Sequence, residues 1–231
     1  MFFDLQYLIL IVPTLILSMW AQYKVHSTFK RYSQVGVRSG MTGAQAAAAV
    51  MRAGGVTDIA IERHQGFLTD HFDPTARALR LSPEVYDGHS ISSVAVAAHE
   101  AGHAIQDKVG YTPLVLRSKL VPLANIGNRL WFLPFIIGLF LAKAPIGATL
   151  MTAGIVMYAA VVLFQIVTLP TEFNASNRAK AVLAQSGIVT TQEEAIGVSK
   201  VLGAAAMTYV AAAAAGVMTL LDLILRSRSR D

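Results

Sequence analysis

The sequence predicts a mainly α-helical membrane protein with a small β-hairpin or sheet and three to four transmembrane helices. Hydrophobic residues make up 54% of the 231 positions, charged residues only 14%, and the mean hydropathy is +0.51. An ordinary soluble domain is less apolar than this. Long uncharged runs supply segments that can cross a bilayer. Between these runs, an alanine-rich segment carries the pattern H-E-x-x-H, which indicates a metal site.

The formal net charge of +5 does not predict nucleic-acid binding. In membrane proteins, basic residues gather at the cytoplasmic ends of the spans for reasons of topology. We therefore expect membrane lipids as partners and no nucleic acid. The chain has no cysteine, which excludes disulfides and cysteine-based metal sites.

The N-terminal segment, residues 1–23, is predicted to be an uncleaved transmembrane anchor. Phe2 to Tyr23 is almost entirely apolar and long enough to span. A cleaved signal peptide is the competing interpretation, but such peptides begin with positive charge, whereas the first charge here is Asp4. Several basic residues follow the anchor, so the positive-inside rule places residues 24–119 in the cytoplasm and the N-terminus outside.

Residues 24–119 have the charge density and turn residues of a water-exposed region. A helix is expected over Thr42–Ala53, with Thr42 as N-cap and glycines at its end. Ile59–Arg63 and Ala76–Leu81 are expected to be two short strands. Two uses of this pair stay open: an edge strand beside a metal could pair with an extended peptide, or a small hairpin could simply pack on the following helix.

That following helix, Ser90–Gln106, carries the H-E-x-x-H pattern. His99 and His103 are four residues apart, so on a helix they share one face and can reach one metal ion. Glu100 lies about 100° around the helix, where it can deprotonate a water without binding the metal. Packed core histidines are the alternative. A catalytic zinc also needs a third protein ligand.

Two further apolar segments, Leu120–Leu141 and Ile146–Leu169, are joined by a tight turn and predict a transmembrane hairpin over residues 120–169. Such a hairpin returns the chain to the side that it left. There, Pro170 is expected to open a new helix, and Glu172 would lie on its first turn.

Glu172 is the predicted third metal ligand, on the region 170–200. The competing carboxylates are Glu84, Asp87, Asp107, Glu193 and Glu194. Thr191 and Glu194 have a simpler explanation, because they match a capping box at the start of a helix.

The last region, residues 201–231, contains an apolar helix and a basic tail. Val201–Leu225 is long enough to span but rich in alanine and glycine, so it is either a fourth span or a helix packed against the site. Basic residues near the span ends are more numerous on the side of residues 24–119, which again favours the cytoplasm for that side.

Several runs resemble the YugP-type neutral zinc metallopeptidases, a family of bacterial membrane proteins. They are L-T-D-H-F-D-P at 68–74, L-R-L-S-P-E-V-Y at 79–86, A-A-H-E-A-G-H-A-I-Q at 97–106, L-P-T-E-F-N-A-S at 169–176 and M-T-Y-V at 207–210. The resemblance covers nearly the whole chain. It implies a multi-pass protein of the bacterial cell (inner) membrane.

More distantly, two helix-borne histidines and a later glutamate look like the gluzincin plan of membrane CAAX prenyl proteases and bacterial heat-shock membrane proteases. Those enzymes commonly carry Asp four residues after the ligand glutamate, to orient a ligand histidine. Here that position is Ser176, so Asn174, Ser176 and Asn177 are candidates for supporting the ligands.

We therefore expect one Zn²⁺ per chain, held by His99, His103 and Glu172. The expected function is a membrane-embedded endopeptidase that cleaves membrane or membrane-proximal proteins, with Glu100 as general base. An oxyanion stabiliser is also needed, with Tyr209 as one candidate. The further candidates are His64, His71 and His89. A catalytically silent zinc-binding scaffold or adaptor in a quality-control complex is the alternative.

Overall fold

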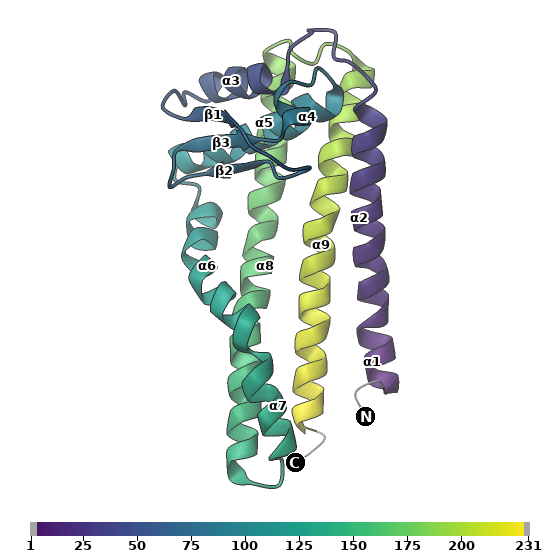
Figure 1. Cartoon of the computed structure of the whole chain (residues 1–231), viewed down its shortest axis with the longest axis vertical. Helices are drawn as coiled ribbons and strands as arrows, with labels where there is room; N and C mark the ends of the chain where they lie inside the picture. The colour runs from purple at the N-terminus through teal and green to yellow at the C-terminus, as the bar shows by residue number, and fades with distance from the viewer. Residues whose placement is uncertain (1–3, 229–231) are drawn as a thin grey trace. The chain divides into compact units, whose positions relative to one another are not determined.

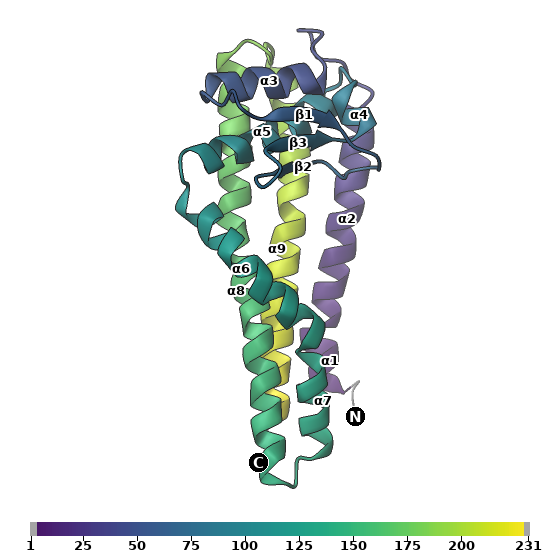
Figure 2. The ribbon, with the colours of Figure 1, turned by 60° about the vertical axis from the view of Figure 1, so that its left-hand side comes forward.

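The computed structural model describes residues 4–228, and the chain divides into two compact units. The first unit comprises Met1–Trp20, Val115–Leu169 and Thr208–Asp231, and the second comprises Ala21–Leu114 and Pro170–Met207. The chain therefore passes between the units several times, within long helices (Figures 1 and 2).

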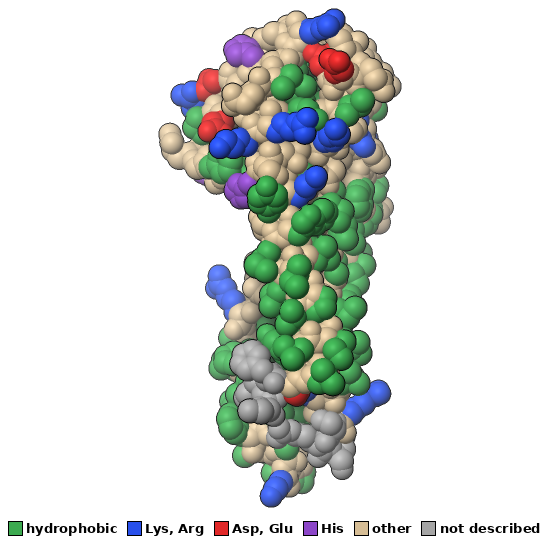
Figure 3. Space-filling view, turned by 90° about the vertical axis from the view of Figure 1, so that its right-hand side faces the viewer, with side chains coloured by type: hydrophobic (Ala, Val, Ile, Leu, Met, Phe, Trp, Pro, Cys, Tyr) green, Lys and Arg blue, Asp and Glu red, His purple; other side chains and the backbone are tan. Residues whose placement is uncertain are grey.

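Over its described residues, the first unit contains helices and the turns that join them, and no strand. Its helices, some of which continue into the second unit, are α1 (Leu5–Leu10), α2 (Val12–Tyr32), α6 (Thr112–Leu130), α7 (Phe132–Phe140), α8 (Pro145–Gln185) and α9 (Gln192–Arg228). Within residues 4–228, four helical stretches are long and apolar enough to cross a membrane: Leu5–Tyr32, Thr112–Phe140, α8 and α9. Three to four spans were predicted, and Val201–Leu225 belongs to the fourth of these candidate spans, as part of α9. On the face shown in Figure 3, hydrophobic side chains cover most of this unit, whereas charged side chains gather on the second.

Close backbone contacts and one charged cluster hold the first unit together. A Cβ built on Gly127 of α6 would lie 2.5 Å from the carbonyl oxygen of Met157 on α8, so only glycine fits there. Near the C-terminal end of α9, the carboxylate of Asp222 accepts hydrogen bonds from Gln6 and Arg226. Arg226 also forms an ion pair with Asp4. The N-terminal helix is thereby tied to the C-terminal one.

The second unit surrounds α5 (Ile91–Lys108), which contacts α3 (Gly43–Ala53), α4 (Pro83–Tyr86) and the sheet. The predicted helix over Thr42–Ala53 is confirmed as α3. Its N-cap is Thr42, whose side chain accepts from the backbone of Gln45 while the Gln45 side chain accepts from Thr42. This capping box satisfies two of the backbone N–H groups that a helix start leaves without partners.

The sheet has three strands in the order β1-β3-β2, with bounds Ala60–Arg63 for β1, His71–Asp73 for β2 and Ala78–Leu81 for β3. The two predicted strands correspond to β1 and β3, but the idea that they form a hairpin is wrong, because they pair in parallel. The hairpin is instead made by β2 and β3, which are antiparallel. β2 was missed because it has only three residues, two of them polar, which is too short for a recognisable alternating pattern.

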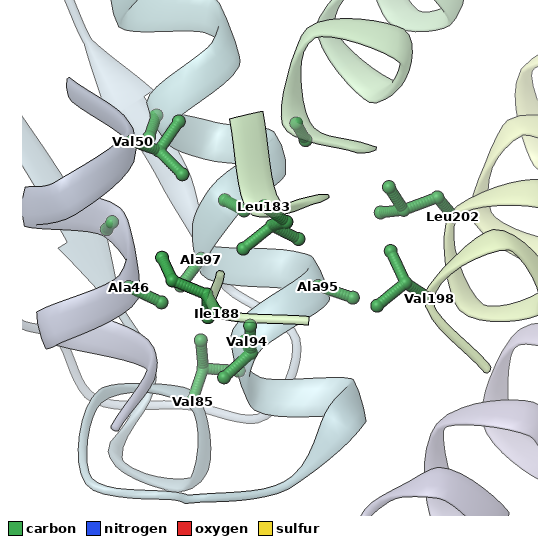
Figure 4. Close-up of a cluster of buried hydrophobic side chains, with 14 of the residues drawn as sticks. Ala46, Val50, Val85, Val94, Ala95, Ala97, Leu183, Ile188, Val198 and Leu202 are labelled. Atoms are coloured by element: carbon green, nitrogen blue, oxygen red, sulfur yellow. The ribbon is translucent and has the colours of Figure 1, made fainter. Parts of the chain in front are cut away.

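The core of the second unit is formed by α5 and by buried residues of the helices, strands and loops that surround it. Small residues on α5, including Ala95 and Ala97, allow larger side chains to approach it. Figure 4 shows Leu183 and Ile188 close to Ala97, and Val198 and Leu202 on the side of Ala95. The alanine-rich composition of α5 therefore serves close packing as well as helix propensity.

Pro170 does not open a new helix: it lies inside α8, which runs without interruption from Pro145 to Gln185. A proline inside a helix removes one backbone hydrogen bond and costs about 3 kcal/mol. The continuous helix offsets this cost because residues before and after Pro170 are buried on one of its faces. Thr168 and Thr171 are 4% and 0% exposed. Similarly, the helix predicted from Leu120 begins eight residues earlier, with α6 at Thr112.

Candidate metal centre

Helix α5 places His99 and His103 side by side, as the i, i+4 spacing predicts. Their ring centroids are 4.8 Å apart and the rings are nearly perpendicular, at 84°. Both residues are largely withdrawn from solvent, with 9% and 7% exposure. The helix begins after Ser90, whose hydroxyl accepts from the backbone N–H of Ser93, as the serine-rich start of the segment predicts.

The third member of the cluster is Glu172, which lies on α8 and is 2% exposed. Its Oε2 lies 3.2 Å from Nε2 of His99 and 3.6 Å from Nε2 of His103. One ligating atom from each of the three residues falls within 4.8 Å of the other two. Residues 73 positions apart in the chain thus meet at one point inside the second unit.

Two contacts fix which ring nitrogens face Glu172. His99 Nδ1 is 3.0 Å from the hydroxyl of Ser176, and His103 Nδ1 is 3.0 Å from Oε1 of Gln106. Because both Nδ1 atoms are engaged elsewhere, both Nε2 atoms are left to converge on the glutamate. Metal-binding histidines ordinarily have such a partner on the second nitrogen.

Of the three residues expected to support the ligands, Ser176 contacts a histidine directly. Asn174 contacts His103 only through Gln106, because its Oδ1 accepts a hydrogen bond from Nε2 of Gln106. Asn177 is exposed, and the described residues show no hydrogen bond between it and the cluster. Gln106 itself was not predicted. The available signal was its position, a polar residue three after His103 in an alanine-rich helix.

Glu100 follows His99 on α5 and is partly buried, with no part in the three-residue group. Desolvation raises the pKa of Glu100, and the nearby histidines oppose this effect. For His103, desolvation lowers the pKa, but hydrogen bonding to Glu172 and the charge of Glu100 raise it, so that it lies above its ordinary value. A carboxylate with a raised pKa can take up and release a proton near neutral pH.

The arrangement fits a zinc ion. Zn–N and Zn–O bonds of about 2.0–2.2 Å at tetrahedral angles place neighbouring ligand atoms about 3.3–3.5 Å apart. The two histidine–glutamate separations, 3.2 and 3.6 Å, bracket that range, and the ligand atoms of all three residues lie within 4.8 Å of one another. Two imidazoles and one carboxylate also form a donor set typical of catalytic zinc, with one position left for water.

Other sequence candidates lie elsewhere or are otherwise engaged. Asp87 pairs with Arg63 and Asp107 with Arg77. Glu194 forms the predicted capping box with Thr191. None of these three carboxylates belongs to the cluster found among residues 4–228.

The remaining candidates for an oxyanion stabiliser stay predictions. The rings of His64 and His71 contact each other, with centroids 5.6 Å apart, and Nδ1 of His89 bonds to the carbonyl oxygen of Gly40. Tyr209 is on α9 in the first unit.

Comparison with known proteins also indicates a zinc protein of the membrane. The family described as "putative neutral zinc metallopeptidase" matches residues 7–228. The chain is 45% identical over 219 residues to the protein described as "Putative membrane protease YugP" from Bacillus subtilis (strain 168), covering 95% of each. No solved structure matches. With a match over nearly its full length, the chain belongs to the family that carries this description, "putative neutral zinc metallopeptidase".

Proposed function

We propose that this membrane protein is a zinc-dependent endopeptidase that binds one Zn²⁺ through His99, His103 and Glu172. The observation that carries the proposal is the convergence of two imidazole Nε2 atoms and one carboxylate oxygen at zinc-ligand spacing. Family membership supports both the metal and the reaction class.

The chemistry that zinc supplies in such a site is that of a Lewis acid, which makes water acidic near neutral pH and polarises a carbonyl. Glu100 is displaced from the ligand face and has a raised pKa. It accepts the proton of the attacking water and then donates it to the amine leaving group. Hydrolysis of the peptide bond is thereby balanced: one water is consumed, and one acid and one amine are formed.

The substrate would be an extended peptide segment close to a membrane. β2 is an edge strand and contacts α5, so its outer side is available to add a peptide strand. Glu172 comes three residues after Leu169, where the apolar stretch of α8 ends. A ligand at that position suits cleavage of membrane or membrane-proximal proteins.

We also propose that the protein lies in the bacterial cell (inner) membrane, with the active site on the cytoplasmic face. The support is the excess of basic residues in and around the region that follows the N-terminal helix, among them Lys24, Lys30 and Arg31. Cysteine labelling of single sites, for example at Lys30 and at Lys143, in intact cells tests this orientation. Labelling of the Lys30 site by an impermeant reagent would reject it.

Metal analysis and a cleavage assay on the purified full chain test the proposal. Wild type should contain one zinc, and His99→Ala and Glu172→Ala should lose it. Glu100→Gln should keep the zinc but lose peptidase activity, because the general base is gone. Full activity in Glu100→Gln, or zinc content unchanged in Glu172→Ala, would reject the proposed roles.

The alternative of a catalytically silent zinc-binding scaffold or adaptor gives a different pattern. Wild type would then bind zinc but cleave neither a membrane-protein substrate nor an unfolded protein, and Glu100→Gln would behave as wild type in every assay. Co-purification of other membrane proteins with both forms would support that alternative.

A further inference from the structure

Gln106 is a buried amide that connects the two helices of the metal centre. It is 0% exposed and lies three residues after His103 on α5. Its Oε1 is 3.0 Å from Nδ1 of His103. Its Nε2 donates to the backbone carbonyl of Thr171 at 2.8 Å and to Oδ1 of Asn174 at 3.0 Å. Both acceptors flank Glu172 on α8.

The chemistry of these partners allows only one orientation of the Gln106 amide. A backbone carbonyl can only accept, so the NH₂ group of Gln106 must face Thr171. The oxygen of the amide then faces His103. The opposite orientation would leave the buried carbonyl of Thr171 against another oxygen, which is unfavourable inside a protein.

A second, independent contact determines the orientation of the Asn174 side-chain amide. Arg178 lies one turn further along α8, and its Nε donates to Oδ1 of Asn174 at 2.7 Å. A guanidinium can only donate, so the oxygen of Asn174, not its nitrogen, is the atom shared by Arg178 and Gln106. Arg178 therefore determines which group donates in the contact between Gln106 and Asn174, and so in the contact between His103 and Gln106.

From these contacts we propose that Arg178, Asn174 and Gln106 form a hydrogen-bond relay that holds His103 as the Nδ1–H tautomer and directs its Nε2 lone pair to the metal. An amide oxygen can only accept, so Nδ1 of His103 has to carry the hydrogen. The three relay residues are positioning residues, since each acts through His103.

His99 lacks such a constraint. The partner of its Nδ1 is the hydroxyl of Ser176, which can either donate or accept. In the absence of metal, the carboxylate of Glu172 also attracts a proton to Nε2 of His103, 3.6 Å away. A neutral imidazole carries one hydrogen, and the relay keeps that hydrogen on Nδ1, which leaves the lone pair on Nε2.

The inference rests on the proposed zinc site but not on peptidase activity. The zinc affinity of the purified full chain, measured by chelator competition, tests it. Gln106→Leu should weaken zinc binding about 10- to 100-fold, the usual effect of losing a partner of a metal-bound histidine. Asn174→Leu should cause a smaller loss. Asn174→Asp is its matched control, because it keeps the acceptor for Arg178 and Gln106, and should bind zinc nearly as wild type does.

A purely structural role of Gln106 would give a different result. Val50→Ala, in the core of the same unit on α3, is the control for general destabilisation and should leave zinc affinity unchanged at a comparable loss of melting temperature. If Gln106→Leu behaves like Val50→Ala, or if Asn174→Asp is as damaging as Asn174→Leu, the relay is rejected.

Imidazole ¹⁵N NMR of the metal-free protein, at a pH where His103 is neutral, reads the tautomer directly. Wild type should show His103 with hydrogen on Nδ1, and Gln106→Leu should shift it to Nε2. An Nε2–H tautomer in wild type would overturn the inference even if zinc binds. If wild type bound no zinc, the proposed function would fail, while this measurement would still decide whether the relay sets the tautomer.

Discussion

Gly102 lies directly against the backbone of Ala175. A Cβ built on Gly102 would be 2.7 Å from the carbonyl oxygen of Ala175, closer than such atoms can approach. Gly102 precedes His103 on α5, and Ala175 follows Glu172 by three residues on α8. The absence of one side chain thus lets the two helices come close enough for their metal-binding groups to meet.

Gly102→Ala should therefore separate α5 from α8 and weaken zinc binding. The new methyl group meets backbone, which cannot rotate away, so we expect a loss of about 1–3 kcal/mol in the free energy of unfolding. Thermal unfolding and zinc content measure the two effects. Gly203→Ala on α9 is the control, since a Cβ there meets nothing within 4 Å. Normal zinc content in Gly102→Ala would contradict this account.

Removal of the metal should lower the melting temperature of the purified protein. The cluster buries a carboxylate and two imidazoles, and an ion bound only by the folded state stabilises it by mass action. Free zinc at 100 times its dissociation constant adds about 2.7 kcal/mol. Thermal unfolding with zinc and with a chelator measures the difference. His99→Ala should lose most of this zinc-dependent shift, and an unchanged shift in that variant would place the ion elsewhere.

Arg226→Met should destabilise the first unit. The Arg226 side chain is 15% exposed and lies 2.7 Å from the carboxylate of Asp222, which is 8% exposed. Removing the cation leaves that carboxylate buried without its counter-charge, a change that costs about 3 kcal/mol or more at fully buried sites and less here. Arg228→Met, at an exposed position, is the control. Equal melting temperatures of the two variants would show that the cluster adds no stability.

Asp70 makes the stability of the folded state depend on pH, and the direction of this dependence follows from its pKa. Desolvation raises its pKa above the ordinary 3.8, although Ser82 donates hydrogen bonds to it. The folded state thus binds this proton more tightly than the unfolded state, so the stabilising contribution is present below pH 3.8 and is lost as pH rises through the folded-state pKa.

Wild type should therefore gain stability relative to Asp70→Asn as pH falls from 7 toward 4. Melting temperatures of both proteins, with a chelator present so that metal binding does not interfere, measure this difference. A difference that stays constant over this pH range would show that Asp70 titrates alike in the folded and unfolded states.

Interactions between near neighbours in the chain were predictable. The capping boxes at Thr42 and Thr191, the pairing of His99 with His103 on one face, and the glycine-terminated helix α3 all depend on groups within a few residues of each other. Their geometry follows from helix pitch and capping chemistry alone.

Features that depend on distant partners were predicted poorly. The parallel pairing of β1 with β3, the short strand β2 and the passage of α8 through Pro170 all arise from packing between segments far apart in the chain. Local rules place a helix boundary at a proline, but they contain no information about what the continued helix buries.

The sequence by itself determined the apolar helices and the chemistry of the cluster, because hydropathy and the i, i+4 spacing are properties of contiguous residues. Only the tertiary structure decided that Glu172 meets the histidines and that Gln106 connects His103 to α8. The physical reason is that these contacts depend on how closely α5 and α8 approach. That distance is set by Gly102 against Ala175, which no local pattern encodes.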